Sequence, residues 1–138
     1  MKTEGREDIL IQPYCEQHWS QIEAIHDAAR RIELEQAGLP EAFVPLKEAA
    51  KKEGLFDYRV DVALLNGKAV GFCAYTEEEL AWLYVAPEQM RKGIGQRLIK
   101  HALCQEPGIR YIEVLFGNEP AKRLYEKMGF QVKEVLSG

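Results

Sequence analysis

The sequence predicts one mixed α/β domain, in which a largely antiparallel sheet is flanked by helices. The chain has 138 residues, which suits a single domain with its own core. Asn66-Gly67 stands between two β-prone runs, which is a strong hairpin signal. Strands and helices alternate in the second half, as in folds that combine a sheet with covering helices. No repeat or linker divides the chain, so we expect residues 1–138 to form one domain.

The first elements are a short strand and two helices. Residues 9–11 are apolar and precede a proline, which predicts a strand. Apolar residues then recur at spacings of three and four, which predicts a helix over about residues 15–34. Gly38 and Pro40 follow as stop signals. A shorter helix is expected over about residues 46–52.

The middle of the chain predicts three consecutive strands. Residues 58–65 and 69–75 flank Asn66-Gly67, and both turn positions of such a hairpin need a positive φ. An acidic triplet leads into a third run at residues 80–85, which ends before a proline.

The last part predicts a helix, a strand, a helix and a strand. The helix opens at Gly93-Ile94-Gly95 and runs to about Cys104, and residues 111–116 form the next strand. Asn118 is suited to cap the following helix and Pro120 to its first turn. Residues 130–136 complete the pattern as a final strand.

Composition narrows the class of protein. The net charge of −4 argues against non-specific binding of nucleic acid. No apolar run approaches the roughly 18 residues needed to span a membrane, and residues 1–8 are too polar for a signal peptide. The three cysteines form no C-x-x-C, and neither they nor the three histidines have metal-ligand spacing. We therefore expect a cytoplasmic protein without a metal, a membrane partner or a nucleic-acid partner.

A glycine-containing loop between the third strand of the middle group and the next helix is the strongest functional signal. The first turn of a helix leaves N–H groups unpaired, and together with the helix dipole these donors attract an anion such as pyrophosphate. Gly93 and Gly95 allow close approach to the backbone, and Arg91, Lys92 and Arg97 add positive charge. A solvated basic turn is the competing interpretation. The loop fits neither the dinucleotide-binding G-x-G-x-x-G pattern nor a Walker A motif.

Two motifs resemble those of the GNAT superfamily of N-acetyltransferases. Val85-Ala86-Pro87 and Gly93-x-Gly95 match the family's Val-x-Pro and Gly-x-Gly/Ala loop. Residues 118–130 match its Asn-x-x-Ala-x-x-x-Tyr-x-x-x-Gly-Phe pattern, and the order of elements agrees over nearly the whole chain. Two positions depart from the loop pattern, since Met90 replaces Arg or Gln and Arg91 replaces a common glycine.

The resemblance implies a V-shaped splay between the fourth and fifth strands of the sheet, and acetyl-CoA as the cosubstrate. The pantetheine arm would pair with the backbone near Leu83, Tyr84 and Val85, and Asn118 would bond to the same arm, besides or instead of capping its helix. The pyrophosphate would lie on the loop formed by Arg91, Lys92, Gly93, Ile94, Gly95 and Gln96. Family members usually have a seventh strand, whereas this sequence ends shortly after the sixth. An uncovered sheet edge is normally protected, so we expect a homodimer.

Acetyl transfer to an amine needs a base, an oxyanion donor and an acid. The resemblance assigns the acid to Tyr125, whose alternative is a role as a core aromatic. The backbone N–H of Val85 is a candidate oxyanion donor. Glu79 is the candidate base, because it precedes Val85 by six residues on one strand and so should share its face. A solvated acidic turn, or Glu77 or Glu78 acting through water, are the alternatives.

The amine acceptor is not identified by the sequence. The pocket for it is expected in residues 32–56, where acidic and aromatic side chains suit a cationic amine. The members of that set are Glu33, Glu35, Glu41, Phe43 and Phe56. The predicted function is an N-acetyltransferase acting on a small molecule or a peptide through a ternary complex. A non-catalytic acetyl-CoA sensor and a structural interaction protein that binds no cofactor are the alternatives.

Overall fold

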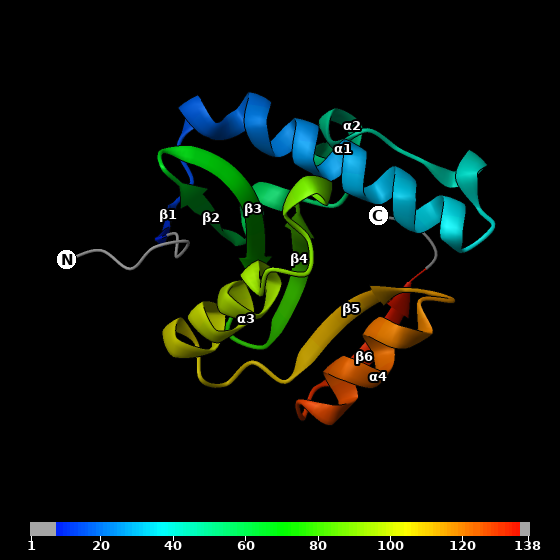
Figure 1. Ribbon diagram of the computed structural model, residues 1–138. Helices are drawn as coiled ribbons and strands as arrows, with labels where there is room; N and C mark the ends of the chain where they lie inside the picture. The colour runs from blue at the N-terminus through cyan, green and yellow to red at the C-terminus, as the bar shows by residue number, and fades with distance from the viewer. Residues whose placement is uncertain (1–7, 136–138) are drawn as a thin grey trace.

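The computed structural model describes residues 8–135 (Figure 1). Six strands form one mixed sheet in the order β1-β2-β3-β4-β5-β6. The strands are β1 (Ile9–Pro13), β2 (Arg59–Leu65), β3 (Lys68–Tyr75), β4 (Glu79–Val85), β5 (Tyr111–Leu115) and β6 (Gln131–Val135). The helices are α1 (Trp19–Gln36), α2 (Leu46–Lys52), α3 (Ile94–Gln105) and α4 (Glu119–Lys127). The predicted fold class and element order are confirmed.

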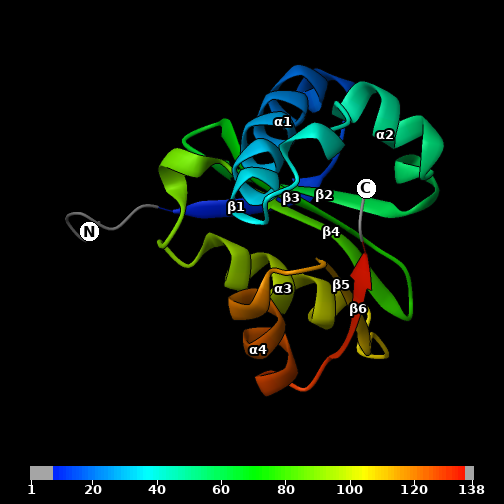
Figure 2. The same ribbon diagram turned by 90° about the vertical axis from the view of Figure 1, so that its right-hand side faces the viewer.

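The helices form two layers, one on each face of the sheet. Figure 2 shows α1 and α2 on one side of the strands and α3 and α4 on the other. One apolar cluster joins Ile22 of α1 and Leu46 of α2 to Phe72 and Trp82 of the sheet. A second cluster buries Leu98 of α3 on the opposite face. The sheet is therefore covered on both faces, so a gap between neighbouring strands gives a ligand access to the backbone inside the sheet.

The β2–β3 hairpin is built as the sequence predicts. Asn66 and Gly67 have φ angles of 53° and 82°, which a two-residue turn of this hand requires. The antiparallel ladder runs from Leu65↔Lys68 to Arg59↔Tyr75 with one irregularity. The β2 and β3 strands are therefore paired along their whole length, without a gap between them.

The β4–β5 pair is different, because its two strands pair only at one end. Parallel pairing links Glu79 with Tyr111 and Leu80 with Ile112, and the ladder holds no further pairs. The pairing of β5 with β6 continues along the whole of β5. As Figure 1 shows, β5 leans away from β4 and carries β6 and α4 with it. The predicted splay between the fourth and fifth strands is present.

The boundaries differ from the expected ones by a few residues. Pro13 is the last residue of β1, since a proline is tolerated in an edge strand. Glu79 lies inside β4, where an acidic turn was one expectation. The predicted end of the last strand at Leu136 and the polar start at residues 1–7 lie outside the described residues. Among residues 8–135, no helix has the length and apolar character to cross a bilayer.

Candidate active site

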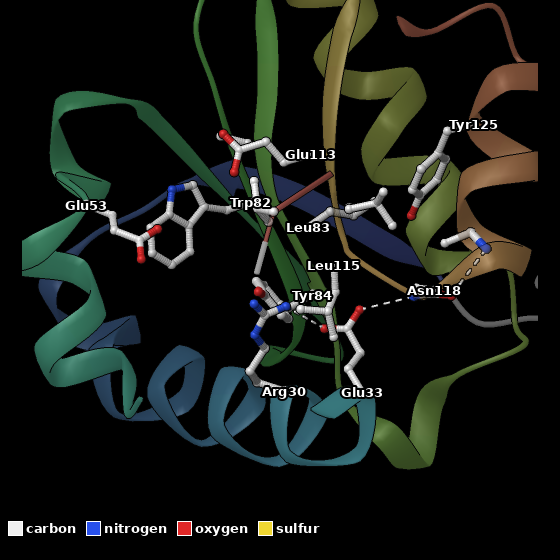
Figure 3. Close-up of a pocket in the computed structure, with 14 residues that line it drawn as sticks. Arg30, Glu33, Glu53, Trp82, Leu83, Tyr84, Glu113, Leu115, Asn118 and Tyr125 are labelled. Atoms are coloured by element: carbon white, nitrogen blue, oxygen red, sulfur yellow. Dashed lines mark hydrogen bonds and ion pairs between the residues drawn. The ribbon is translucent and has the colours of Figure 1, made fainter. Parts of the chain in front are cut away.

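The opening between β4 and β5 is a cavity with about 530 Å³ of space not filled by atoms, part of it open to solvent. Figure 3 shows side chains from α1, β4, β5 and α4 converging on it. Its lining includes Arg30, Glu33, Glu53, Trp82, Leu83, Tyr84, Glu113, Leu115, Asn118 and Tyr125. Charged groups from distant parts of the chain thus meet where β4 and β5 separate.

The backbone of β4 presents a donor to this opening. The Ala86 N–H donates to the Val70 carbonyl of β3 at 2.9 Å. Because successive N–H groups of a strand point to opposite edges, the Val85 N–H points away from β3 and toward the β5 side. An N–H in this position is suited to bond a ligand carbonyl or a developing oxyanion.

A second cavity lies beside the first, at the start of α3. Leu83 and Tyr125 line both cavities, so the two are neighbours. The second is lined by Val85, Gln89, Met90, Arg91, Gly93, Ile94, Gly95, Gln96, Ile99 and Leu124. Most of the loop residues that the sequence analysis assigns to pyrophosphate therefore surround one hollow.

The loop has the unpaired donors of an anion site. Arg97 N–H closes the first helical turn on the Gly93 carbonyl at 3.1 Å. Within residues 8–135, the N–H groups of Gly93, Ile94, Gly95 and Gln96 meet no backbone acceptor. They form the positive end of the α3 dipole. This geometry fits a phosphate group, and it does not depend on the side chains at the two positions that depart from the family pattern.

Arg91 holds an unusual backbone conformation in the same loop. Its φ is +67°, in the left-handed region that favours glycine. Arg91 occupies the position where the family commonly has a glycine. Arg91 thus adopts a left-handed conformation without the glycine that favours it, and the loop carries local strain.

Tyr125 projects from α4 between the two cavities. Its ring packs edge-on against Phe130 at 6.4 Å between centroids, so the side chain belongs partly to the core. Burial, and then the negative charge of Glu33, raise the pKa of Tyr125 to about 12. The phenol stays protonated at neutral pH and is suited to give a proton rather than to take one.

Asn118 is the cap of α4, as the sequence predicts. Its Oδ1 accepts a bond from the Ala121 N–H at 3.3 Å, and its Nδ2 donates to Glu33 Oε2 at 3.3 Å. Glu33 in turn pairs with Arg30 at 3.1 Å (Figure 3). A pantetheine arm would have to share or displace the bond between Asn118 and Glu33.

Carboxylates gather near the end of the opening where β4 and β5 still pair. Glu113 points from β5 into the cavity, and Glu53, just after α2, lines it as well (Figure 3). Burial, hydrogen bonding to Glu79, and the charges of Glu79 and Glu53 raise the pKa of Glu113 to about 7, while Lys133 opposes the shift. An ordinary glutamate has a pKa near 4.3. Glu113 is thus a carboxyl group that changes protonation near neutral pH.

The expectation that Glu79 shares a face with Val85 is wrong. The register between β3 and β4 advances from Ala74↔Trp82 to Tyr75↔Leu80, so Ala81 is an extra residue, a β-bulge. As a result Leu80 and Val85, five positions apart, both pack against the α3 side. Glu79 is turned to the opposite face, toward α2, where its carboxylate binds Lys133 Nζ at 3.3 Å. Glu79 does not line the main cavity.

The acceptor stretch at residues 32–56 is only partly placed in the site. Glu33 lines the main cavity, whereas Glu35, Glu41, Phe43 and Phe56 do not. Phe43 instead lies under the Arg31 guanidinium, 3.9 Å from its ring centroid, and Phe56 packs on Tyr14.

Glu53 also lines the cavity from within the expected stretch, although it was not singled out, and the sequence analysis missed Trp82 and Glu113 as lining residues. A signal existed for Glu113: it is a charged residue between Ile112 and Val114 in a strand that borders the predicted splay. In the described part of the chain, no three histidine, cysteine, aspartate or glutamate residues are grouped in a way that could hold a metal ion.

Comparison with known proteins agrees with this geometry. A family model described as "Acetyltransferase (GNAT) domain" matches residues 56–132. The chain is 34% identical over 114 residues to the peptidyl-lysine N-acetyltransferase YjaB of Salmonella typhimurium, covering 80% of this chain and 70% of that protein. It is 29% identical over 127 residues to the uncharacterized N-acetyltransferase YafP of Escherichia coli, covering 90% of this chain and 82% of the relative.

A solved structure has the same fold. The PaiA N-acetyltransferase of Thermoplasma acidophilum, in complex with coenzyme A, superimposes with a TM-score of 0.70 at 21% sequence identity, and 91% of each chain is covered. The chain belongs to the GNAT acetyltransferase family. The family assignment made from the two motifs is confirmed, and with it the prediction of an enzyme that transfers acetyl groups to amines.

Proposed function

We propose that this protein transfers the acetyl group of acetyl-CoA directly to the side-chain amine of a lysine in a peptide or protein. The observation that carries the proposal is the pair of adjoining cavities that share Leu83 and Tyr125. One adjoins the anion-binding end of α3, which suits a pyrophosphate. The other is lined by carboxylates and aromatic side chains, which suit a cationic amine. The relative named a peptidyl-lysine N-acetyltransferase supports lysine as the acceptor.

In this proposal the pyrophosphate lies on the loop from Arg91 to Gln96 and the pantetheine arm passes Leu83 toward the Val85 N–H. The thioester carbonyl would accept a bond from that N–H, which stabilises the oxyanion as the amine attacks. Tyr125, between the two cavities, would protonate the leaving sulfur. Asn118 would contact the arm after giving up part of its bond to Glu33.

A test needs both binding and turnover. Calorimetry should detect acetyl-CoA binding to the wild-type protein, and mass spectrometry should detect a gain of one acetyl group on a lysine-containing peptide with a blocked N-terminus. The same peptide with norleucine in place of lysine is the matched control. Acetyl-CoA binding without acetylation of any amine would favour the sensor alternative, and no binding at millimolar acetyl-CoA would contradict both.

The cellular location, the partners and the oligomeric state of the protein remain predictions. We expect it in the cytoplasm, with no nucleic-acid or membrane partner, and as a homodimer. Light scattering of the complete chain at several concentrations checks the last point, and a monomer mass at high concentration would contradict it.

A further inference from the structure

The acidic end of the main cavity combines groups from parts of the chain that are far apart in sequence. Glu113 stands on β5 and lines the cavity, and Glu53 lines it from the segment after α2. Glu79, at the start of β4, pairs with Tyr111 of β5. Its carboxylate binds Lys133 Nζ of β6 at 3.3 Å. Lys133 lies over the Tyr111 ring, 5.1 Å from its centroid.

The other groups around Glu113 divide into anions, cations and phenols. The carboxylates of Glu79 and Glu53 act on Glu113 directly, and Lys133 is the cation that acts on it. Arg30 and Glu33 of α1, paired at 3.1 Å, complete the charged lining. Burial, with the negative charge of Glu113 among the smaller causes, raises the pKa of Tyr58 and of Tyr84. Both phenols are therefore neutral at neutral pH and add no negative charge beside Glu113.

We infer that Glu113 is the general base that takes a proton from the acceptor ammonium, and that Glu79 and Lys133 set the pH at which it does so. The inference rests on the proposed transfer to a lysine amine. Glu113 is preferred to Glu79 because Glu113 lines the cavity, whereas Glu79 lies outside the lining and is held by Lys133. Burial raises the pKa of Glu53, and the positive charges of Arg30 and Lys52 oppose that shift. Because Glu53 also lines the cavity, its carboxylate is suited to hold the incoming ammonium.

The chemistry requires such a group. A lysine amine has a pKa near 10.4, so at neutral pH nearly all of it is protonated and cannot attack a carbonyl. A base is most effective when its own pKa lies near the working pH. Burial beside Glu79 and Glu53 places Glu113 there, with a pKa of about 7.

The proton and bond balance is complete with this chain's residues and the two substrates. One ammonium proton passes to the Glu113 carboxylate, and the freed nitrogen forms a C–N bond to the thioester carbon. When the C–S bond breaks, the sulfur takes the Tyr125 phenol proton, and the nitrogen's second proton restores the phenol. Glu113 then loses its proton to solvent, so the reaction yields an amide, a thiol and one released proton.

The test is the pH dependence of turnover, measured by release of CoA thiol with a lysine peptide between pH 5.5 and 9. We expect the wild-type kcat to fall below about pH 7 with unit slope. Glu113→Gln should lower kcat at pH 8 by about 100-fold or more, remove that acidic limb and leave the Kd for acetyl-CoA within twofold. Glu53→Gln should instead raise KM with a smaller effect on kcat. Glu48→Gln, on the exposed side of α2, is the matched charge control and should match the wild type.

Two neighbours give a signature that a purely structural role would not produce. Removal of the negative charge in Glu79→Gln should move the acidic limb to lower pH, and removal of the positive charge in Lys133→Met should move it to higher pH. A lysine analogue with fluorine beside the amine has a lower amine pKa, and it should recover much of the rate lost in Glu113→Gln.

The inference is overturned if Glu113→Gln keeps the wild-type kcat and pH profile, or if the fluorinated acceptor recovers no activity. Failure of the proposed function looks different, because the wild-type protein would then leave the lysine peptide unacetylated at every pH.

Discussion

The β2–β3 and β4–β5 pairs of strands lie in one sheet and serve opposite purposes. The antiparallel β2–β3 ladder extends from end to end, and its inner residues are almost completely buried. The β4–β5 pair holds two Cα pairs and then opens. Backbone groups that a strand would otherwise satisfy are left on the β5 side of β4. Unpaired backbone groups are costly unless water or a ligand bonds them, so the second region loses stability and gains a binding edge.

The first way to test this contrast is to damage each region in turn. Phe72 of β3 is fully buried, so Phe72→Ala should destabilise the protein by about 3–5 kcal/mol through the cavity it leaves. Leu83 of β4 is only half-buried beside the opening, and Leu83→Ala should cost about 1 kcal/mol while weakening acetyl-CoA binding. Urea unfolding and calorimetry measure the two effects. Equal destabilisation by both substitutions would contradict the contrast.

The second prediction concerns Tyr125, which lies between the two cavities. Tyr125→Phe removes one oxygen and should lower kcat by at least about 100-fold, because the sulfur then leaves without its acid. The ring still packs on Phe130, so the Tm and the Kd for acetyl-CoA should change little. Stopped-flow assays of thiol release and calorimetry on the same preparation check both. Unchanged turnover would leave Tyr125 as a core aromatic only.

The third prediction is that the folded protein becomes more stable when the negative charge of Glu113 is removed. A carboxyl whose pKa is raised on folding lowers stability as pH rises from its unfolded value, near 4.3, through its folded value. For Glu113 the pKa in the folded protein is about 7. The loss of folding stability that its charge causes is therefore fully present above that pH and absent below pH 4.

Glu113→Gln should therefore stabilise the protein at pH 8 by on the order of 2 kcal/mol, after allowance for solvent screening, and should have little effect at pH 4. Thermal unfolding of both proteins at the two pH values measures the difference. Glu48→Gln serves again as the exposed control. A stabilisation independent of pH would show that the charge of Glu113 is not the cause.

Much of the fold could be predicted from local patterns, whereas the proton-transfer site could not. The Asn66-Gly67 hairpin, the Asn118 cap and the loop before α3 are each determined by residues a few positions apart. The face of the sheet on which Glu79 lies depends on a β-bulge at Ala81. The bulge arises from the pairing of β4 with β3, so the sequence of β4 alone does not reveal it. Glu53 and Glu113 are brought together by the packing of α2 on the sheet that contains β5, so no spacing in the sequence reveals that they line one cavity.

The smallest predicted effect lies in the loop between β4 and α3. Arg91 has a φ of +67°, and Arg91→Gly should relieve roughly 1 kcal/mol of strain and raise the Tm slightly. Acetyl-CoA binding should be kept, because the donors are backbone groups. Asn66→Gly in the hairpin is the matched substitution at φ 53°, and it should gain less, since asparagine tolerates this conformation. A loss of acetyl-CoA binding in Arg91→Gly would show that the side chain, rather than the backbone, holds the phosphates.

Hydrogen–deuterium exchange with and without acetyl-CoA tests most directly whether the open β4–β5 edge and the adjoining start of α3 form the binding site. Bound acetyl-CoA should slow exchange of the N–H groups of residues 83–85 and 93–96, by tenfold or more at saturation, and leave the β2–β3 ladder within experimental error. Protection spread evenly over the sheet, or absent from both segments although the ligand is bound, would contradict the account.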